Sequence, residues 1–462
     1  MTATHAARSP RSRPRRRELA ARPGVVVTAI AAGGVAVLWL WWHDQPADLS
    51  DLGGWLTAAG RITGLLAGYA VPVQLLLMSR TPALDRGVGA DRLARWHASG
   101  GRYAICLMAA HAVLITWGYA VSIHEGVIRQ AGTLLASYPD VLTATAALGL
   151  FLLAGAVSAR AIRRRIRYET WYYLHLYTYL ALALAFAHVF ALGYDFRSAP
   201  AARIGWAALY IGTGVVLFTY RIAVPVLSAL RHRLRVAAVR TEAPGVTSLH
   251  IAGRNLAALR PQPGQFFRWR FLTRDGWWQS HPFSLSAVPS PTTRRLRITV
   301  KALGDHTAAL QHARPGTRVI AEGPYGAITP ARRTGRNVVL LAGGVGITAI
   351  RALAEAFAGP ASPQGHGEAV LVYRVNQPRE IVFRAELDAL ARRGGLDVRY
   401  LVGPPGSAAD VLVGDRLAAA VPGLADRDAF VCGPAGFVTA AVQALRRAGV
   451  PAARIHAERF EF

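Results

Sequence analysis

The stretch His97-Ala-Ser-Gly-Gly-Arg-Tyr-Ala-Ile-Cys-Leu-Met-Ala-Ala-His111 places two histidines fourteen residues apart in an apolar segment. A second apolar segment carries His175 and His188, thirteen residues apart. At about 1.5 Å per residue, each interval spans roughly 20 Å along a helix, which is most of a hydrocarbon core of about 30 Å. Imidazole is a common axial ligand of haem iron, and two haems need four such ligands. The spacing predicts two stacked metal groups between two membrane helices.

The heights of the histidines predict one haem on His97 and His175 and another on His111 and His188. Both haems are expected to be b-type, because the chain has no C-x-x-C-H attachment motif. A step of fourteen residues returns to within about 40° of the same helix face, but a step of thirteen lies about 140° away. The second helix is therefore expected to be distorted, for example by a π-bulge, or its two side chains lean differently. Without the repeated spacing, each histidine would read as a cavity-lining residue or a partner of a polar neighbour.

The composition indicates a membrane protein, because 52% of the 462 residues are hydrophobic and the apolar residues gather in the first half. Six segments approach the length that a membrane helix needs. The first is expected to be retained rather than cleaved, since it ends in Trp39-Leu-Trp-Trp42 and not in small residues. The six predicted spans are about 25–42, 55–78, 97–120, 140–159, 171–192 and 204–224.

Arginines predict the orientation of these spans. They cluster in the N-terminal head and after the second, fourth and sixth spans, whereas the alternate loops are poor in arginine. By the positive-inside rule, the N-terminus and everything after the sixth span are cytoplasmic, in a multi-pass protein of the plasma (inner) membrane. The net charge of +27 is then explained by anionic lipid at the membrane edges, and nucleic acid is not an expected partner.

Cysteine usage excludes two features. Cys106 lies within a predicted span and Cys432 near the C-terminus, so a structural disulfide between them is not expected. Two cysteines also cannot build a four-cysteine iron–sulfur cluster, and this excludes a fused plant-type ferredoxin domain.

The pattern changes near residue 232, where short β-type runs bounded by Gly and Pro begin. Residues 232–330 predict a small antiparallel β-barrel. Residues 335–462 predict an open α/β sheet, because apolar strands at 337–342, 369–374, 397–402 and 428–432 alternate with helical stretches. The glycine-rich run Gly343-Gly-Val-Gly-Ile-Thr348 follows the first of these strands and opens a helix. Such a turn lets a backbone approach a pyrophosphate at a helix N-terminus.

Several motifs occur in a specific order: Pro263-Gly-Gln-Phe266, His281-Pro-Phe-Ser-Leu-Ser286, Gly304-Asp-His-Thr307, Glu322-Gly-Pro-Tyr-Gly326, the glycine run, Cys432-Gly-Pro434 and a terminal Glu-x-Phe. In this order they resemble the ferredoxin–NADP reductase superfamily. With six spans and four spaced histidines before them, the chain resembles the ferric reductase and NADPH oxidase family. This resemblance implies four parts: a basic cytoplasmic tail (1–24), a six-helix transmembrane domain (25–224), an FAD-binding barrel (232–330) and an NAD(P)-binding α/β domain (335–462).

The resemblance also implies residue roles. In the flavin site, His281 and Pro282 would lie near the phosphate or ribityl region, Phe283 against the flavin ring and Ser284 near its N5, while Gly304 and Thr307 would meet the pyrophosphate. The nucleotide would be cradled by Gly343, Gly344, Gly346 and Thr348. Cys432 and Glu458 would lie near the nicotinamide. Phe460 would cover the flavin, although Phe462 also follows and either phenylalanine fits that role.

The implied activity is that of an NAD(P)H-dependent flavohaem oxidoreductase. Electrons would pass from a cytoplasmic nicotinamide nucleotide through FAD and two haems to an acceptor at the outer face, such as a ferric chelate or oxygen. NADPH is expected over NADH, because Arg374 ends a strand where the second ribose should lie and arginine suits a 2′-phosphate. Alternatively, Arg374 is a solvated charge or a partner of Glu380.

Two other function classes remain open at this point. One is a membrane-anchored cytoplasmic flavin reductase that serves a protein partner without transmembrane transfer. The other is a haem-bearing sensor without turnover. The four placed histidines argue against the first, and the complete set of flavin and nucleotide motifs argues against the second.

Overall fold

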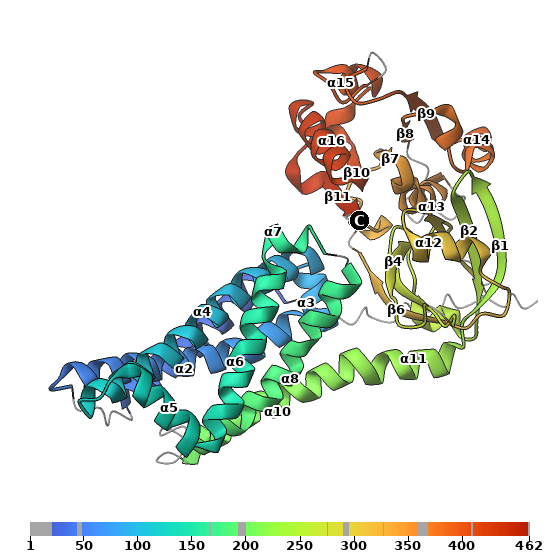
Figure 1. Cartoon of the computed structure of the whole chain (residues 1–462). Helices are drawn as coiled ribbons and strands as arrows, with labels where there is room; N and C mark the ends of the chain where they lie inside the picture. The colour runs from blue at the N-terminus through green and yellow to red at the C-terminus, as the bar shows by residue number, and fades with distance from the viewer. Residues whose placement is uncertain are drawn as a thin grey trace, which may run out of the picture. The chain divides into compact units, whose positions relative to one another are not determined.

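The computed structural model describes residues 21–43, 49–166, 168–192, 200–274, 276–289, 295–326, 328–358, 368–407 and 410–460. Most of the predicted basic tail, together with Glu461 and Phe462, lies outside these residues. The chain divides into two compact units, Met1–Arg221 and Ile222–Phe462. The first unit is helical and the second contains all the described strands (Figure 1).

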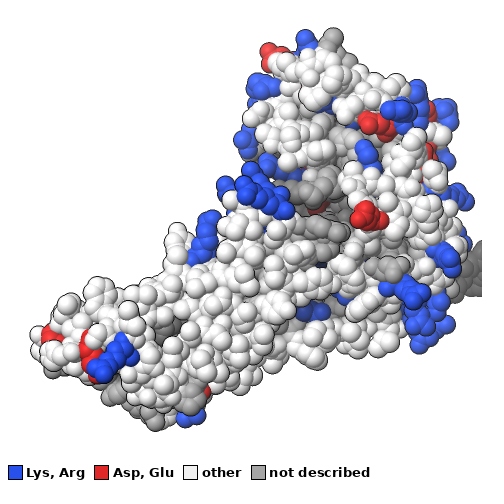
Figure 2. All heavy atoms as spheres, viewed as in Figure 1, with Lys and Arg blue, Asp and Glu red and all other residues white. Residues whose placement is uncertain are grey.

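The helices of the first unit are α1 (Pro23–His43), α2 (Leu52–Leu77), α3 (Pro82–Gly87), α4 (Ala90–Ser122), α5 (Val127–Ser137), α6 (Pro139–Ser158), α7 (Arg160–Arg163), α8 (Tyr168–Leu192) and α10 (Pro200–Phe218). A π-helical turn, η1 (Thr219–Ala223), and α11 (Val224–His232) follow α10. Each predicted span therefore coincides with a helix. On the face shown in Figure 2, the middle of this unit carries no charged residue, as a membrane segment requires.

Five segments of the described chain are long and apolar enough to cross a membrane: Pro23–His43, Leu52–Leu77, Arg92–Ser122, Asp140–Ser158 and Pro200–His232. The expectation of six spans is thus met only in part. The sixth expected span, over α8, is not among these five segments. The last segment is also longer than expected, because α10, η1 and α11 follow one another without a break.

Small residues let α2 and α4 approach closely. A Cβ on Gly60 would lie 2.8 Å from Ile115 Cγ1, and a Cβ on Gly118 would lie 2.8 Å from the Thr57 nitrogen. On the other side of α2, the Tyr69 hydroxyl donates to the Ile30 carbonyl of α1 (2.9 Å). Close contacts at small residues stabilise helix pairs in membranes by van der Waals packing, because the hydrophobic effect does not drive helices together in lipid.

The first part of the second unit has six antiparallel strands: β1 (Arg235–Ala243), β2 (Val246–Ala252), β3 (Phe266–Phe271), β4 (His281–Ser284), β5 (Arg295–Lys301) and β6 (Val319–Tyr325). They form two sheets, in the orders β1-β2-β5 and β4-β3-β6. The two sheets join at both edges: β1 meets the start of β6 through the bridge of Arg235 with Arg318, and the end of β4 meets β5 through the bridge of Leu285 with Ile298. The predicted antiparallel domain is therefore present as two sheets around one core. Alternation along β3 buries Phe267, Trp269 and Phe271 in that core.

The second part is a five-stranded parallel sheet in the order β11-β10-β7-β8-β9. Its strands are β7 (Val338–Gly343), β8 (Ala369–Val375), β9 (Leu396–Val402), β10 (Asp428–Pro434) and β11 (Ile455–Phe460). The helices α13 (Ile347–Ala358), α14 (Arg384–Arg392), α15 (Arg416–Ala420) and α16 (Ala435–Arg447) connect them. Strand order reverses between β7 and β10, and ligands of such sheets bind outside the carboxyl ends of the strands at that point.

Candidate functional site

The four histidines face each other in the two predicted pairs. The imidazole rings of His97 on α4 and His175 on α8 have centroids 6.0 Å apart, with planes at 78°. Those of His111 and His188 have centroids 6.3 Å apart, with planes at 67°. Two imidazoles on opposite sides of one metal ion, each at a nitrogen–metal distance of about 2 Å, place their ring centres roughly 6 Å apart. Both pairs therefore fit a metal between the rings.

The described residues hold no group of three or more His, Cys, Asp or Glu side chains that could bind a metal ion by themselves. Each pair supplies two ligands, so its metal would take the remaining ligands from a bound group. The structure also resolves the angular difficulty of the thirteen-residue step. It assigns α8 as α-helix from Tyr168 to Leu192, and the π-helical turn lies at η1 instead. The expected π-bulge is therefore not found between the two histidines of α8, and both of their rings nevertheless face the histidines of α4.

The rings on α4 are fixed by backbone carbonyls. Nδ1 of His111 lies 2.8 Å from the Gly60 oxygen, and Nδ1 of His97 lies 3.2 Å from the Gln74 oxygen. A hydrogen bond of this kind sets the tautomer and turns Nε2 toward a ligand. On α8, Nδ1 of His175 and of His188 is buried and has no hydrogen-bond partner among the described residues.

His175 is held by stacking instead. The Trp171 ring lies over it with a centroid distance of 5.2 Å and an interplanar angle of 20°. Trp171 donates through Nε1 to Ser158 Oγ (3.1 Å), and the Arg163 guanidinium lies 4.8 Å from its ring centroid. Sequence reasoning did not identify Trp171, although its position one turn before His175 was a usable signal.

The predicted flavin motif forms β4, which pairs with β3 so that Ser284 lies opposite Phe266. Ser284 is 3% exposed, and its hydroxyl has no hydrogen-bond partner among the described residues. A buried hydroxyl in this state is rare, because leaving a polar group unsatisfied costs about 1–3 kcal/mol. The orphaned Oγ therefore fits a hydrogen bond to a bound group.

Three rings stack at the start of β4. His281 lies over Phe283 (centroids 6.2 Å, 19°) and over His306 of α12 (Asp305–Ala309; centroids 4.3 Å, 23°). Burial lowers the pKa of His306, so this imidazole is neutral at pH 7. Pro282 is exposed beside the stack. The stack brings together the predicted flavin residues His281 and Phe283.

Thr307 is used to shape its own loop. Its hydroxyl accepts from the Leu303 and Gly304 nitrogens (2.9 and 3.0 Å) and donates to the Gly304 oxygen (2.9 Å). The hydroxyl is thus occupied within the loop. Any contact of Gly304 and Thr307 with a pyrophosphate stays a prediction.

The glycine-rich run 343–348 packs directly against the end of β10. A Cβ on Gly346 would lie 2.8 Å from Gly433 Cα, and a Cβ on Gly343 would meet the Phe437 ring. Gly344 has φ +52° and open space around its Cα. Thr348 is buried and donates to the Val345 oxygen (3.0 Å). Glycine is therefore required for packing at 343 and 346, while Gly344 leaves a backbone surface open to a ligand.

Cys432 and Glu458 are direct neighbours in the β10–β11 register, and Phe460 lies opposite Pro434. Cys432 is fully buried, and burial, with the charge of Glu458, raises the pKa of its thiol. The Glu458 carboxylate lies close to Gly326 at the end of β6, so it approaches the strands that carry the flavin motif. Phe460 is half-buried at the edge of the core. The other candidate cover, Phe462, lies outside the described residues.

Arg374 lies beside Gly343 at the carboxyl end of β8. It forms an ion pair with Asp410 (Nη1 to Oδ2, 3.5 Å), and their side chains are 11% and 5% exposed. Of the alternatives for Arg374, the structure therefore supports neither a solvated charge nor a pair with Glu380. Sequence reasoning missed Asp410, which lies 36 residues further along the chain.

Comparison with known proteins assigns the three parts of the chain. Residues 63–186 match the family described as ferric reductase like transmembrane component. Residues 232–329 match an FAD-binding domain family, and residues 340–443 match the oxidoreductase NAD-binding domain. The resemblance drawn from the motifs is thereby confirmed.

Named relatives match about half of this chain. The ferredoxin reductase component of 3-ketosteroid-9-alpha-monooxygenase from Mycolicibacterium smegmatis is 34% identical over 242 residues, which are 49% of this chain and 65% of that protein. The flavohemoprotein of Vibrio cholerae is 31% identical over 215 residues, or 44% of this chain and 52% of that protein. This chain thus spans less than two thirds of either relative. A solved ferredoxin reductase in carbazole 1,9a-dioxygenase is 22% identical over 50% of this chain and 69% of its own, with a TM-score of 0.41.

Proposed function

This chain is a ferric reductase-like membrane protein fused to FAD-binding and NAD-binding domains of the ferredoxin reductase type, and we propose that it passes electrons from NADPH through FAD and two b-type haems to an acceptor at the outer face of the membrane. The observation that carries the proposal is the geometry of the two histidine pairs, at 6.0 and 6.3 Å between ring centres. A flavin reductase with a membrane part serving only as anchor has no need of two such pairs.

The flavin site is proposed to be built around β4. Ser284 offers its unsatisfied buried hydroxyl to the flavin edge, and Phe283 offers its ring. When bound, flavin accepts a hydride and releases single electrons, and each haem carries one electron. The protein itself orients these groups and excludes water. Electron transfer between them requires no nucleophilic side chain.

The nucleotide site is proposed at the carboxyl ends of β7, β8 and β10. Gly344 leaves backbone open to the pyrophosphate, and Arg374 faces the second ribose. Cys432 and Glu458 flank the nicotinamide position from neighbouring strands. Phe460 is proposed to occupy the flavin face until the nicotinamide displaces it.

The haem sites are proposed on His97 with His175, toward the cytoplasm, and on His111 with His188, toward the outer face. The carbonyls of Gln74 and Gly60 orient the two ligands on α4. Stacking on Trp171 orients His175. Two imidazoles for each metal leave no open position, which suits electron transfer rather than binding of a substrate to iron.

The test is one double variant in the purified full-length protein, compared with a single-residue control. His111→Ala with His188→Ala should lose about half of the haem, and NADPH should still reduce the flavin while reduction of an external ferric chelate stops. His124→Asn is the matched control, because His124 lies outside both pairs at φ +55°, a conformation that asparagine tolerates. Unchanged haem content in the double variant would refute the assignment of the ligands.

A second candidate is favoured by the names of the relatives, which are ferredoxin reductase components of oxygenase systems. In that case the chain would be a membrane-anchored reductase for a separate protein partner. The same double variant separates the two functions, since a reductase of this second kind would keep its full activity toward a soluble one-electron acceptor protein and would have no haem-dependent step to lose.

A further inference from the structure

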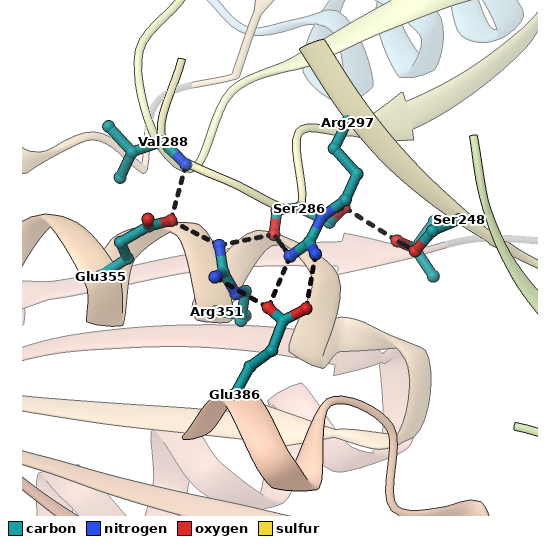
Figure 3. A network of polar contacts seen from close by, with 8 residues as sticks. Ser248, Ser286, Val288, Arg297, Arg351, Glu355 and Glu386 are labelled. Carbon is teal, nitrogen blue, oxygen red and sulfur yellow. Dashed lines mark hydrogen bonds and ion pairs between the residues drawn. The ribbon is translucent and has the colours of Figure 1, made fainter. Parts of the chain in front are cut away.

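One carboxylate bridges two guanidinium groups between the FAD-binding and NAD-binding parts of the second unit (Figure 3). Glu386 of α14 accepts from Arg297 of β5 through both oxygens (2.7 and 2.9 Å). It also pairs with Arg351 of α13 (Oε2 to Nη2, 2.8 Å). Paired, two-oxygen bonds of this type are among the strongest and most directional in proteins.

The same arginines bind the segment that follows the flavin motif. The Ser286 carbonyl accepts from Arg297 Nη2 (2.6 Å) and Arg351 Nη1 (3.1 Å). Glu355 accepts from the Val288 nitrogen (2.9 Å) and pairs with Arg351. Contacts from Arg297 of β5 and from Arg351 and Glu355 of α13 therefore converge on residues 286–288, as the dashed lines in Figure 3 show.

Behind Ser286 the network continues into the FAD-binding sheets. Its hydroxyl accepts from Thr299 Oγ1 (2.8 Å), which in turn contacts Ser248 Oγ (2.7 Å). Ser248 and Ser286 are fully buried, and Thr299 is 3% exposed. The carbonyl that the two arginines bind is thus fixed on its own side of the boundary as well.

The charges make Glu386 the critical member. The side chains of Arg297 and Arg351 are only 10% and 9% exposed, so two like charges are held together out of water. Burial alone would raise the pKa of Glu386, but its bonds to the two arginines outweigh burial and lower it. Glu386 is therefore ionised at neutral pH. Without its charge the two guanidinium groups would repel each other, and removing one partner from a buried ionic group is strongly destabilising.

The network lies close in sequence to the residues predicted to bind the nucleotide and to those predicted to bind the flavin. Arg351 follows Thr348 by about one helical turn, on the helix that the glycine run opens. Ser286 follows Ser284, the proposed flavin-edge residue, by two positions. A shift at these contacts would move the nucleotide loop relative to the flavin strand. Hydride transfer needs reacting atoms about 3–3.5 Å apart, and a misplacement of 1 Å costs about 100-fold in rate.

We propose that Glu386 is a positioning residue for hydride transfer, which it serves by clamping Arg297 and Arg351 so that the NAD-binding part meets the FAD-binding part at reacting distance. The proposal rests on the proposed NADPH-to-flavin step. The residues proposed to bind NADPH lie in the NAD-binding part alone. Loss of the clamp should therefore slow hydride transfer and leave the affinity for NADPH nearly unchanged.

The experiment uses full-length protein in detergent and anaerobic stopped-flow reduction of the flavin by NADPH. Glu386→Gln should lower the limiting rate by about tenfold or more and weaken the nicotinamide–flavin charge-transfer absorbance, while the Kd for NADPH changes by less than about threefold. Asp388→Asn is the matched control, because Asp388 lies on the same helix and, within the described part of the chain, its carboxylate forms polar contacts with Tyr400 and Arg384 of the NAD-binding part. This control should behave as wild type.

A limiting rate within about twofold of wild type in flavin-loaded Glu386→Gln overturns the proposal, as does an equal loss in Asp388→Asn. If Glu386→Gln does not fold, Arg297→Lys serves instead, because lysine keeps the charge but cannot make the paired bond. An unchanged rate in that variant also overturns the clamp. Absence of flavin reduction in wild type would refute the proposed function itself, so the two failures are distinct.

Discussion

At the residue scale, the cofactor preference of the proposed nucleotide site depends on the ion pair between Arg374 and Asp410. Arg374 is the residue proposed to meet the second ribose, and Asp410 already neutralises its guanidinium in a nearly buried pair. Asp410 is held in turn by the Gly406 and Leu412 nitrogens (2.8 and 3.1 Å). Preference for a 2′-phosphate therefore depends on a competition between that phosphate and the Asp410 carboxylate for Arg374.

Asp410→Asn should raise the preference for NADPH over NADH, because it removes the competing carboxylate, and Arg374→Ala should lower it. A charge-assisted hydrogen bond contributes about 1.5–3 kcal/mol, so changes of roughly 10- to 150-fold in the ratio of kcat/KM values are expected. Asp397→Asn, in an exposed pair with Arg399, is the control. If wild type favours NADH, or if Arg374→Ala leaves the ratio unmoved, Arg374 is not the selector.

Cys432 gives a second prediction at this scale. Its raised pKa keeps the buried thiol protonated, and only thiolate reacts readily. In a Cys106→Ser background, a maleimide at pH 8 should modify Cys432 at least about 100-fold more slowly in folded than in denatured protein. The thiol's contribution to stability is present below about pH 8.5 and declines above it, because the folded state binds the proton more tightly. Rapid labelling of folded protein would contradict this environment.

At the element scale, the contact between α2 and α4 builds one side of the outer histidine pair. His111 packs against α2. Its Nδ1 lies within hydrogen-bond distance of the Gly60 carbonyl oxygen, and the missing side chain of Gly64 leaves room for its ring. A Cβ at Gly64 would lie 2.5 Å from that Nδ1, which is too close for any real contact. The close contact between α2 and α4 therefore also sets the position of the His111 ring.

Gly64→Ala should displace His111 and lower the outer haem content, so that haem absorbance falls toward half. Gly149→Ala on α6 is the matched control, because a Cβ there meets nothing within 4 Å. Haem per protein and the low-spin spectrum measure the effect, with melting temperature recorded for both variants. Equal haem content in the two variants would mean that the ring at 111 does not hold a haem.

At the scale of the whole molecule, the direction of electron flow depends on how the spans are oriented. Arginines gather between α6 and α8, at Arg160, Arg163, Arg164 and Arg165, whereas the turn between α4 and α5 carries Glu125. From the positive-inside rule, we expect the segment between α6 and α8 in the cytoplasm and the turn between α4 and α5 outside. The proposed path from NADPH to an outer acceptor requires this orientation.

Single cysteines report the orientation directly. In a Cys106→Ser background, Glu125→Cys should react with a membrane-impermeant maleimide on intact cells, and Ala161→Cys should react only after the cells are opened. Both positions are exposed, and Cys432 is buried in every variant. The opposite labelling pattern would place the second histidine pair inward and reverse the proposed path.

Features carried by short stretches of chain were predictable from sequence. Histidine spacing, apolar length and the order of glycine and proline motifs are local patterns, and they predicted the paired histidines, the helices and the strand–loop–helix at Gly343–Thr348. The parallel strands β7 to β10 begin and end within one or two residues of the predicted ones. These patterns suffice because periodicity and turn chemistry are decided by neighbours in the chain.

Other features were decided only by the tertiary structure. The two sheets join around one core, the two histidines of α8 face those of α4, and Asp410 neutralises Arg374. Glu386 meets Arg297 across 89 positions of sequence. Each of these depends on which charged or aromatic side chains share a buried space, and burial is what makes such a contact strong or costly. The sequence by itself therefore determined the FAD-binding and NAD-binding parts and the order of the apolar helices, whereas the folded packing decided which charged and aromatic side chains meet.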